Sequence, residues 1–376
     1  MQSRSAIVVG AGIVGLATAR ALALQGFSVK VFERTERAVG ASIRNFGMVW
    51  PVGQPEGKLY ERAKRSRDIW KEISGTGAFW SEAIGSLHLA YHPDEWMVLQ
   101  ELFEIFRTEG RPVKLLDKDG ILAISPAANP NGLIGGLYSS DEVIVDPREA
   151  IGALPAYLTA QHGVQFYWNK CISYISEQTV YIGNNEEYTA DLIFVCNGAD
   201  FETLYPEHFA KQAVTKCKLQ MMRLVSQPEG WRIGPALCGG LSLTHYHSFK
   251  AAPSLAGLKE RYNAGMPDYV KWGIHVMVSQ NGSGELTIGD SHEYGLTHDP
   301  FDREFINGLV LDYMKKIARF KDWTLAQSWN GIYTKLTDGA ADLFFSPEPY
   351  IYVINGLGGA GMTLSFGLAE ELVKGL

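Results

Sequence analysis

A G-x-G-x-x-G turn near the start of the chain constrains its fold more than any other feature. Gly10, Gly12 and Gly15 follow an apolar, β-branched run at residues 5–9, and residues 13–25 carry the apolar spacing of a helix. In such a turn the first glycine permits the tight bend, the second lets the backbone approach a pyrophosphate, and the third lets the helix pack on the strand. The pattern predicts a dinucleotide held by backbone N–H groups at the helix N-terminus.

An acidic residue completes this first unit. Gly26 ends the predicted helix, a second strand is expected at Ser28–Phe32, and Glu33 stands directly after that strand. A carboxylate in this place accepts hydrogen bonds from ribose hydroxyls and repels a 2′-phosphate. We therefore expect an adenosine diphosphate cofactor that lacks the phosphate.

A second glycine-rich turn lies near the other end of the chain. The segment Gly356–Thr363 (GLGGAGMT) follows a buried strand expected at Tyr350–Ile354 and leads into a helix expected at Thr363–Lys374. It would supply a second set of backbone N–H groups at a helix N-terminus. A reduced flavin carries negative charge that such a helix end stabilises, so the turn favours FAD over NAD. A glycine-rich helix cap without a ligand is the alternative interpretation.

The remaining sequence predicts two kinds of sheet. Buried strands return after Asp146-Pro147, whereas residues 217–289 alternate between strands and turns, as in an antiparallel sheet. Asn281-Gly282 is interpreted as a hairpin turn and not as a glycosylation site. The other elements expected after Asp146 are a helix at Arg148–Gln161 and strands at Val164–Tyr174, Gln178–Ile182 and Leu192–Cys196.

These elements predict an α/β plus α+β fold in two discontinuous domains. A chain of 376 residues exceeds one typical domain. We expect a Rossmann-like FAD-binding domain at 1–85, 145–215 and 325–376, and an antiparallel-sheet substrate domain at 86–144 and 216–324.

Charge and composition exclude several classes of partner. The net charge of -7 argues against a nucleic-acid or anionic-membrane partner, because both require a basic face. No apolar run reaches the ~18 residues of a membrane span, so none is expected. The cysteines are far apart, which predicts neither a zinc site nor a disulfide framework and favours a reduced, cytoplasmic protein. They are Cys171, Cys196, Cys217 and Cys238.

Several segments, in order along the chain, resemble the D-amino-acid-oxidase superfamily, close to glycine oxidase and monomeric sarcosine oxidase. These are Gly10–Glu33, Ala41–Met48 (ASIRNFGM), Leu192–Ala199 (LIFVCNGA) and the C-terminal glycine cluster. The resemblance implies FAD as the cofactor, with Cys171 and Asn197-Gly198 by its adenosine half. Together with the two glycine turns, it gives the following expected FAD-binding residues: Gly10, Gly12, Ile13, Val14, Gly15, Glu33, Arg34, Ser42, Ile43, Arg44, Asn45, Met48, Cys171, Asn197, Gly198, Gly331, Gly358, Gly359, Ala360, Gly361, Met362 and Thr363.

The chain departs from this pattern at three positions. Gly331 stands where sarcosine oxidase has the cysteine that bonds covalently to flavin, which implies noncovalent FAD. Tyr333 replaces the arginine with which glycine oxidase grips its substrate carboxylate, and Thr363 replaces the lysine of sarcosine oxidase. A guanidinium matches a carboxylate bidentately, so its loss implies a differently shaped anion or a neutral group.

Other residues offer donors for an anion, and the residues expected in the catalytic and substrate site are Tyr333, Arg44, Met48, Lys335, His245 and His247. Arg261 is a further candidate donor. Taken alone, His245 and His247 are better explained as two same-face histidines on an exposed strand. A metal site on this H-x-H pair lacks an evident third ligand, so no metal is expected.

The resemblance is nearest to a clade associated with phosphonate breakdown, through residues 43–48, Gly284–Tyr294 (GELTIGDSHEY) and the C-terminal turn. It implies oxidative deamination of a small primary or secondary amine, such as 2-aminoethylphosphonate or its N-methyl form, by hydride transfer to flavin and hydrolysis of the imine. Electrons would pass to O2 or to an unknown carrier.

Other functions fit the same motifs. A glycine, sarcosine or D-amino-acid oxidase is the first alternative. A flavin monooxygenase, a noncatalytic FAD-binding subunit and a nicotinamide dehydrogenase follow. Apart from Gly10–Gly15 and the C-terminal cluster, the chain has no further G-x-G-x-x-G to form the second nucleotide site of the first of these three. The C-terminal glycine turn disfavours the last.

Overall fold

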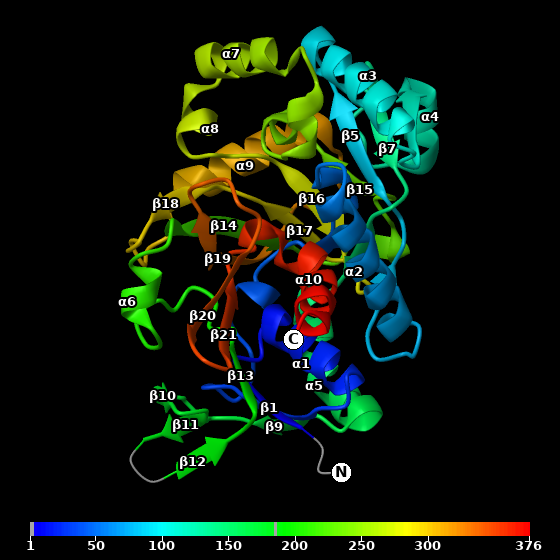
Figure 1. Cartoon of the computed structure of the whole chain (residues 1–376). Helices are drawn as coiled ribbons and strands as arrows, with labels where there is room; N and C mark the ends of the chain where they lie inside the picture. The colour runs from blue at the N-terminus through cyan, green and yellow to red at the C-terminus, as the bar shows by residue number, and fades with distance from the viewer. Residues whose placement is uncertain (1–3, 184–185) are drawn as a thin grey trace.

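The computed structural model describes residues 4–183 and 186–376. The chain forms two parts, one around a mostly parallel sheet and the other around a larger mixed sheet, and both termini lie in the first part (Figure 1). The predicted combination of α/β and α+β architecture is confirmed.

The first sheet has the strand order β20-β21-β13-β1-β2-β9. Strand β1 pairs in parallel with β2 and β13, β13 pairs in parallel with β21, and β20 joins antiparallel at one edge. The bounds are β1 (Ser5–Val9), β2 (Ser28–Phe32), β9 (Gln165–Tyr167), β13 (Leu192–Val195), β20 (Leu343–Glu348) and β21 (Ile351–Asn355). The first two strands match the expected bounds, and the helix between them ends at Leu24, one residue before the expected end, so the βαβ unit is confirmed.

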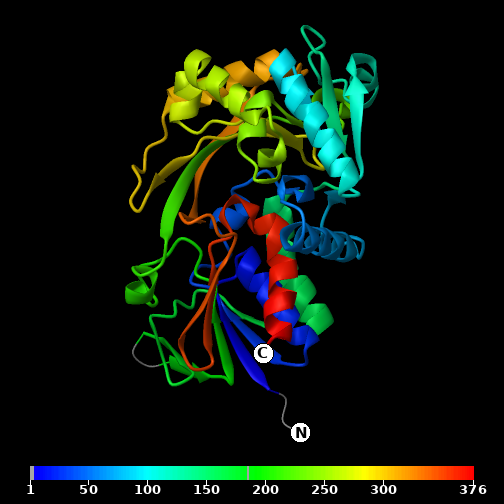
Figure 2. The same cartoon turned by 45° about the horizontal axis from the view of Figure 1, so that its top comes forward.

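Helices α1 and α5 pack against this sheet, α10 packs on α1, and α2 packs on α10; Figure 2 shows α10 running alongside α1. Their bounds are α1 (Ile13–Leu24), α2 (Lys58–Ser74), α5 (Pro147–His162) and α10 (Gly361–Lys374). Helix α5 begins one residue before the predicted Arg148, because Asp146 accepts hydrogen bonds from two backbone N–H groups and Pro147 fills the first helical position. It ends at Gly163, whose φ of 67° suits glycine.

A buried aromatic contact holds the start of α10 in place. Trp70 on α2 is fully buried, and its ring meets Phe366 edge-on with the ring centroids 5.1 Å apart. Its Nε1 also donates to the carbonyl oxygen of Met362 at 2.8 Å. Packing on α2 therefore orients the C-terminal glycine turn.

The second sheet has the order β18-β14-β17-β16-β15-β5-β7-β6, and β19 pairs with β14. Neighbouring strands are antiparallel except for β15 and β5. The bounds are β5 (Ser86–Ala90), β6 (Val113–Asp117), β7 (Gly135–Ser139), β14 (Val214–Leu224), β15 (Ala236–Cys238), β16 (Met277–Gln280), β17 (Leu286–Gly289), β18 (Glu293–Gly295) and β19 (Leu325–Leu336).

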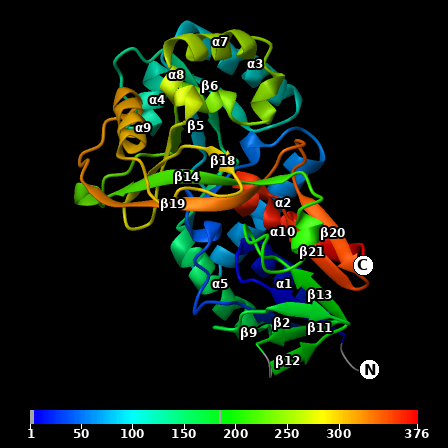
Figure 3. The same cartoon turned by 90° about the vertical axis from the view of Figure 1, so that its left-hand side faces the viewer.

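One strand departs from the expected division of the chain. We expected 325–376 to lie wholly with the first sheet, but β19 pairs along its whole length with β14 of the second. Figure 3 shows these two long strands side by side between the two parts. Pairing with β14 satisfies the backbone hydrogen-bonding groups of β19 along its length, which accounts for its place in the second sheet. The other domain boundaries remain a prediction.

Five helices cover the second sheet on the side away from the first part (Figure 1). They are α3 (Pro93–Thr108), α4 (Lys118–Ile124), α7 (Leu255–Gly265), α8 (Pro267–Lys271) and α9 (Glu304–Ile317). Their apolar faces share one core with the sheet, including the fully buried Leu99, Leu237 and Ile288. Residues 217–289 thus contain two helices that the antiparallel interpretation missed.

Two small three-stranded sheets and the short helix α6 (Pro206–Phe209) complete the fold. One sheet joins β3 (Met48–Val49), β4 (Ser81–Glu82) and β8 (Val143–Val145), and the other joins β10 (Tyr174–Ser176), β11 (Thr179–Ile182) and β12 (Glu186–Thr189). The expected strand at Val164–Tyr174 is wrong beyond Tyr167. Asn169 has a φ of 57°, a left-handed conformation that interrupts a strand.

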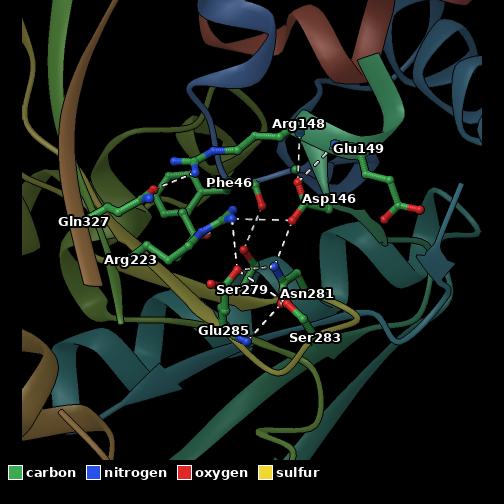
Figure 4. Close-up of polar contacts among 12 residues, drawn as sticks. Phe46, Asp146, Arg148, Glu149, Arg223, Ser279, Asn281, Ser283, Glu285 and Gln327 are labelled. Atoms are coloured by element: carbon green, nitrogen blue, oxygen red, sulfur yellow. Dashed lines mark hydrogen bonds and ion pairs between the residues drawn. The ribbon is translucent and has the colours of Figure 1, made fainter. Parts of the chain in front are cut away.

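The predicted turn at Asn281-Gly282 is confirmed between β16 and β17, which pair antiparallel. Its side chains also join the two parts of the molecule (Figure 4). Asp146, at the start of α5, accepts a hydrogen bond from Asn281 at 2.8 Å and lies 3.5 Å from the guanidinium of Arg223 on β14. Arg148 of α5 donates to Gln327 of β19 at 2.6 Å.

All four cysteines are free thiols, and only Cys171 is exposed. In the part of the chain that the structure describes, no helix is both long and apolar enough to cross a membrane.

Candidate active site

A single cavity of about 1390 Å³ runs between the two parts of the molecule, from the ends of β1 and β2 to the wall formed by the second sheet. Most of the residues predicted from the sequence line it. These are Gly10, Gly12, Ile13, Val14, Glu33, Arg34, Ser42, Arg44, Asn45, Met48, Cys171, Asn197, Gly198, His245, His247, Gly331, Tyr333, Lys335, Gly358, Gly359, Ala360, Gly361, Met362 and Thr363.

The first glycine turn has room only for glycine at two positions. A Cβ on Gly10, whose φ is 102°, would lie 2.5 Å from the carbonyl oxygen of Cys196. A Cβ on Gly15 would lie 1.9 Å from the carbonyl oxygen of Gly10, so Gly15 packs α1 onto β1 and lies outside the cavity lining. Gly12 precedes α1 without a side-chain cap of its own, and although Ser42 accepts the N–H of Ile13, the rest of this helix N-terminus stays open to an anion.

Side chains from neighbouring segments frame this end of the cavity. The carboxylate of Glu33 accepts hydrogen bonds from the backbone N–H of Ala11 at 2.9 Å and from the hydroxyl of Thr35 at 2.9 Å. Its position against the first turn suits a carboxylate that binds ribose hydroxyls. The guanidinium of Arg34 pairs with Asp200 at 2.8 Å and closes the same rim.

The segment after β2 contributes through both backbone and side chains. Ser42, in the short helix η1 (Ala41–Ile43), accepts a hydrogen bond from the N–H of Ile13 at 2.9 Å. Arg44 donates to the carbonyl oxygens of Val39 at 2.9 Å and Asn330 at 3.1 Å, so its guanidinium ties this segment to β19. Ile43 packs in the core and does not line the cavity.

The C-terminal turn forms the opposite face. Gly358 has a φ of 57°, and η6 (Gly358–Ala360) leads directly into α10, which has no side-chain cap at its start. Thr363 accepts a hydrogen bond from the backbone N–H of Trp50 at 2.9 Å. The hydroxyl of Thr363 is therefore engaged within the protein, and the open backbone of the turn is the part that faces the cavity.

Strand β19 forms the wall of the cavity above this turn. Gly331, Tyr333 and Lys335 occupy every second position of the strand and therefore share one face of it. A Cβ placed on Gly359 would lie 3.6 Å from the hydroxyl of Tyr333, so the strand and the turn approach closely. Burial, and then the neighbouring Cys217, raise the pKa of Tyr333 well above its ordinary value. Its phenol is therefore a neutral hydrogen-bond donor at physiological pH.

Three histidines that the sequence analysis did not group together lie close to one another farther along the same wall of the cavity. His245, His275 and His292 each place a ring nitrogen within 4.8 Å of those of the other two. The carboxylate of Asp290 lies 3.0 Å from Nε2 of His275. Burial, and then the neighbouring His275 and His292, hold the pKa of His245 well below its ordinary value. Burial also lowers the pKa of His292, although Asp290 opposes this effect.

The structure corrects two interpretations of this region. His245 and His247 do not lie on a strand, because they follow η4 (Gly240–Thr244) in a turn. His247 lines the cavity but stays outside the histidine cluster, whereas His275 and His292 join it. Arg261 does not reach the cavity, since its guanidinium pairs with Asp94 and Glu95 of α3.

The lining fits an FAD molecule. Two helix N-termini open into one elongated cavity, a carboxylate stands at one end, and glycines occupy the places where a Cβ would collide or fill the space. These features define a dinucleotide-binding protein whose cofactor cavity is bounded on one side by the second sheet.

The chain belongs to the DAO family of FAD dependent oxidoreductases, whose family model matches residues 5–374. It is an FAD-dependent oxidoreductase, and FAD is its cofactor.

Known proteins resemble the chain over different lengths. It is 31% identical over 128 residues to the tRNA 5-methylaminomethyl-2-thiouridine biosynthesis bifunctional protein MnmC of Burkholderia ambifaria, a match that covers 32% of this chain and 20% of that protein. The chain thus matches about a fifth of the length of this relative.

Solved structures match the whole fold. Glycine oxidase from Geobacillus kaustophilus superposes with a TM-score of 0.75 at 20% identity, over 100% of this chain and 95% of that one. L-proline dehydrogenase from P. horikoshii superposes with a TM-score of 0.78 at 20% identity, over 99% and 92%. At this identity the likeness establishes the fold.

Proposed function

We propose that the protein oxidatively deaminates a small primary or secondary amine that carries an acidic group, such as 2-aminoethylphosphonate or its N-methyl form. The observation that carries this proposal is the composition of the cavity wall. Beside Tyr333, the wall presents the ammonium groups of Lys250 and Lys335. Lys216, by contrast, is held in an ion pair, and Arg44 donates to backbone carbonyl oxygens. Several separate donors suit a tetrahedral oxyanion better than a planar carboxylate.

The fold neighbours support an amine or an amino acid as the substrate class. Glycine oxidase and L-proline dehydrogenase both act, by their names, on a carbon that bears nitrogen. When bound, FAD supplies the hydride acceptor. The substrate C–N bond then becomes an imine, and water hydrolyses the imine to a carbonyl compound and the free amine or ammonia.

The protein's own residues would position and shield this substrate. Tyr333 can donate a hydrogen bond because its phenol stays neutral. Met48 and Met221 add apolar surface to the same cavity and exclude water. The backbone N–H groups at the start of α10 offer positive potential to a developing negative charge.

The proposal is tested by anaerobic mixing of the FAD-loaded protein with an amine panel while the flavin absorbance is followed. The panel contains glycine, sarcosine, D-alanine, 2-aminoethylphosphonate and its N-methyl form. We expect rapid bleaching by the two phosphonates. Rapid bleaching by glycine or sarcosine but not by the phosphonates would establish the first alternative, an amino-acid oxidase, which the likeness to glycine oxidase favours.

Tyr333→Phe sharpens this test. Loss of one hydrogen bond worth about 1.5 kcal/mol would lower kcat/KM roughly tenfold, whereas FAD content should stay the same. Tyr174→Phe, on an exposed tyrosine outside the cavity lining, is the matched control. Equal turnover of the two variants would remove Tyr333 from the proposed site.

Three further points belong to the proposal. Noncovalent FAD is supported by Gly331, which offers no nucleophile from its position on the cavity wall. Either O2 or a carrier could reoxidise the flavin, and peroxide release on amine addition distinguishes them. Bleaching by any amine also excludes a noncatalytic FAD-binding subunit. The cytoplasmic location stays a prediction.

A further inference from the structure

Three histidines far apart in the sequence form one compact group in the cavity wall. The ring centroid of His245 lies 3.9 Å from that of His275 and 4.7 Å from that of His292, and the latter two are 5.0 Å apart. His275 and His292 are 4% and 5% exposed, whereas His245 shows part of its surface to the cavity.

Backbone hydrogen bonds hold the segments that carry the two buried histidines in place. His275 donates its backbone N–H to the carbonyl oxygen of Asp290 at 3.2 Å, and Asp290 donates back at 2.8 Å. The backbone N–H of His292 donates to Trp272 at 2.8 Å. The two buried histidines therefore lie on paired segments, and the turn after η4 brings His245 over them.

One nitrogen of each buried ring faces a neighbouring oxygen, and the other nitrogen of His292 lies 3.9 Å from Asp290, beyond hydrogen-bond distance. Nδ1 of His292 lies 2.8 Å from the carbonyl oxygen of Gly273, which makes Nδ1 the protonated nitrogen and leaves Nε2 as the acceptor. Nε2 of His275 lies 3.0 Å from Asp290, and Nδ1 of His275 is buried without a partner in the described chain. A buried imidazole nitrogen without a partner is costly unless a ligand engages it.

We propose that His245, His275 and His292 together bind one divalent transition-metal ion, with Zn²⁺ as the best match. Imidazole nitrogen is a preferred ligand of Zn²⁺, and three such ligands with one open position form a common zinc geometry. Tetrahedral Zn²⁺ holds its nitrogen ligands about 3.3 Å apart, whereas these ring nitrogens lie within 4.8 Å of one another, so the rings would rotate to direct their nitrogens at one ion. Asp290 and the Gly273 carbonyl supply the outer contacts that orient ligating histidines.

The fourth position of such an ion would face the cavity, because all three histidines line it. The ion would therefore be accessible from the substrate side and not sealed within the protein. Metal binding can be measured without any amine, so the outcome does not depend on the proposed function.

The test is a Zn²⁺ titration of the tag-free, FAD-loaded protein after treatment with a chelator, followed by calorimetry and by metal analysis after dialysis. We expect one Zn²⁺ per chain. His245→Ala, which removes the ligand nearest the cavity, should weaken binding by more than about a hundredfold, and Asp290→Asn by about ten- to a hundredfold. His247→Ala is the matched control, since this neighbouring histidine lies outside the cluster, and its affinity should equal that of the wild type.

Independent measurements keep the result decisive. Retained flavin absorbance and circular dichroism show that each variant is folded. Co²⁺ added to the wild type should give the visible absorption of a tetrahedral site at wavelengths beyond the flavin bands. Absence of bound Zn²⁺ in the wild type, or equal Zn²⁺ affinity in folded His245→Ala, would overturn the proposal.

Discussion

The side chain of Asp146 both caps helix α5 and contacts the second sheet. Its removal should therefore lower the free energy of unfolding by more than the loss of a helix cap alone. Oδ1 accepts the backbone N–H of Arg148 at 2.9 Å and so caps α5. Oδ2 accepts the amide of Asn281 at 2.8 Å and lies 3.5 Å from Arg223, which is only 4% exposed. The carboxylate thus connects the first part of the molecule to the second sheet, as Figure 4 shows.

The expected loss in Asp146→Ala follows from these contacts. A lost N-cap costs about 1 kcal/mol. Removal of one partner from a buried ion pair costs up to about 3–5 kcal/mol, but Arg223 keeps Glu285 at 3.2 Å and Thr287 at 3.2 Å, so we expect about 1–2 kcal/mol from this contact. The free energy of unfolding should therefore fall by about 2–3 kcal/mol.

Urea denaturation at fixed protein and FAD concentrations measures this loss from the shift in midpoint. Asp117→Ala is the matched control, because Asp117 is an exposed N-cap that accepts from Gly120 at 2.8 Å in α4. We expect this variant to lose about 1 kcal/mol. Equal losses in Asp146→Ala and Asp117→Ala would refute the argument that the connection between the two parts stabilises the fold.

Three further perturbations test the pH dependence, the first turn and the cofactor contact. Burial raises the pKa of Glu142 from 4.5 to about 7, so the folded state binds this proton more tightly than the unfolded state does. The free energy of unfolding should therefore fall by about 3 kcal/mol as pH rises from about 4.5 to about 7. Glu142→Gln should flatten the plot of urea midpoint against pH, and parallel plots for this variant and the wild type would contradict the assignment. Gly15→Ala should lose FAD and lower Tm, because the new Cβ would lie 1.9 Å from a carbonyl oxygen. Gly152→Ala, inside α5, is the control: its Cβ would have no atom within 4 Å, so this variant should be about 1 kcal/mol more stable. A similar Tm for the two variants would count against the packing role of Gly15. Glu33→Gln should raise the Kd for FAD by roughly thirtyfold, equivalent to about 2 kcal/mol, in a fluorescence titration of the apoprotein, and an unchanged Kd would place the ribose elsewhere.

The elements that the sequence predicts best are those whose signals are local. The unit from β1 through Glu33 needs only a buried strand, three glycines and a short helix, and each of these is read within a few residues. Strand β19 could not be assigned in this way. Its apolar residues suit either sheet, and its partner β14 lies far away in the sequence, so only the tertiary structure decides between them.

The same distinction applies to the cavity. Positions next to a glycine turn were identified from the turn, and nearly all of them line the cavity. Ile43 belongs to the same segment as Ser42 and Arg44, but it points into the core because a short helix turns its side chain away from theirs. Arg261 was a candidate only by residue type, and its pairing with Asp94 and Glu95 could not be read from spacing.

The histidine cluster could not be predicted from sequence patterns, because it depends on which segments pair in the folded protein. His245 and His247 suggested a pair because they are two residues apart, but alternate residues share a face only on a strand, and the chain turns at this point. His275 meets Asp290 because two segments exchange backbone hydrogen bonds, which in turn brings His292 beside it. Through this pairing and the turn that carries His245, the cavity gains a group of three imidazoles on the same wall as Tyr333, where the resemblance predicts an arginine. If that group binds a metal ion, positive charge is restored to this wall by a ligand set that no single stretch of sequence contains.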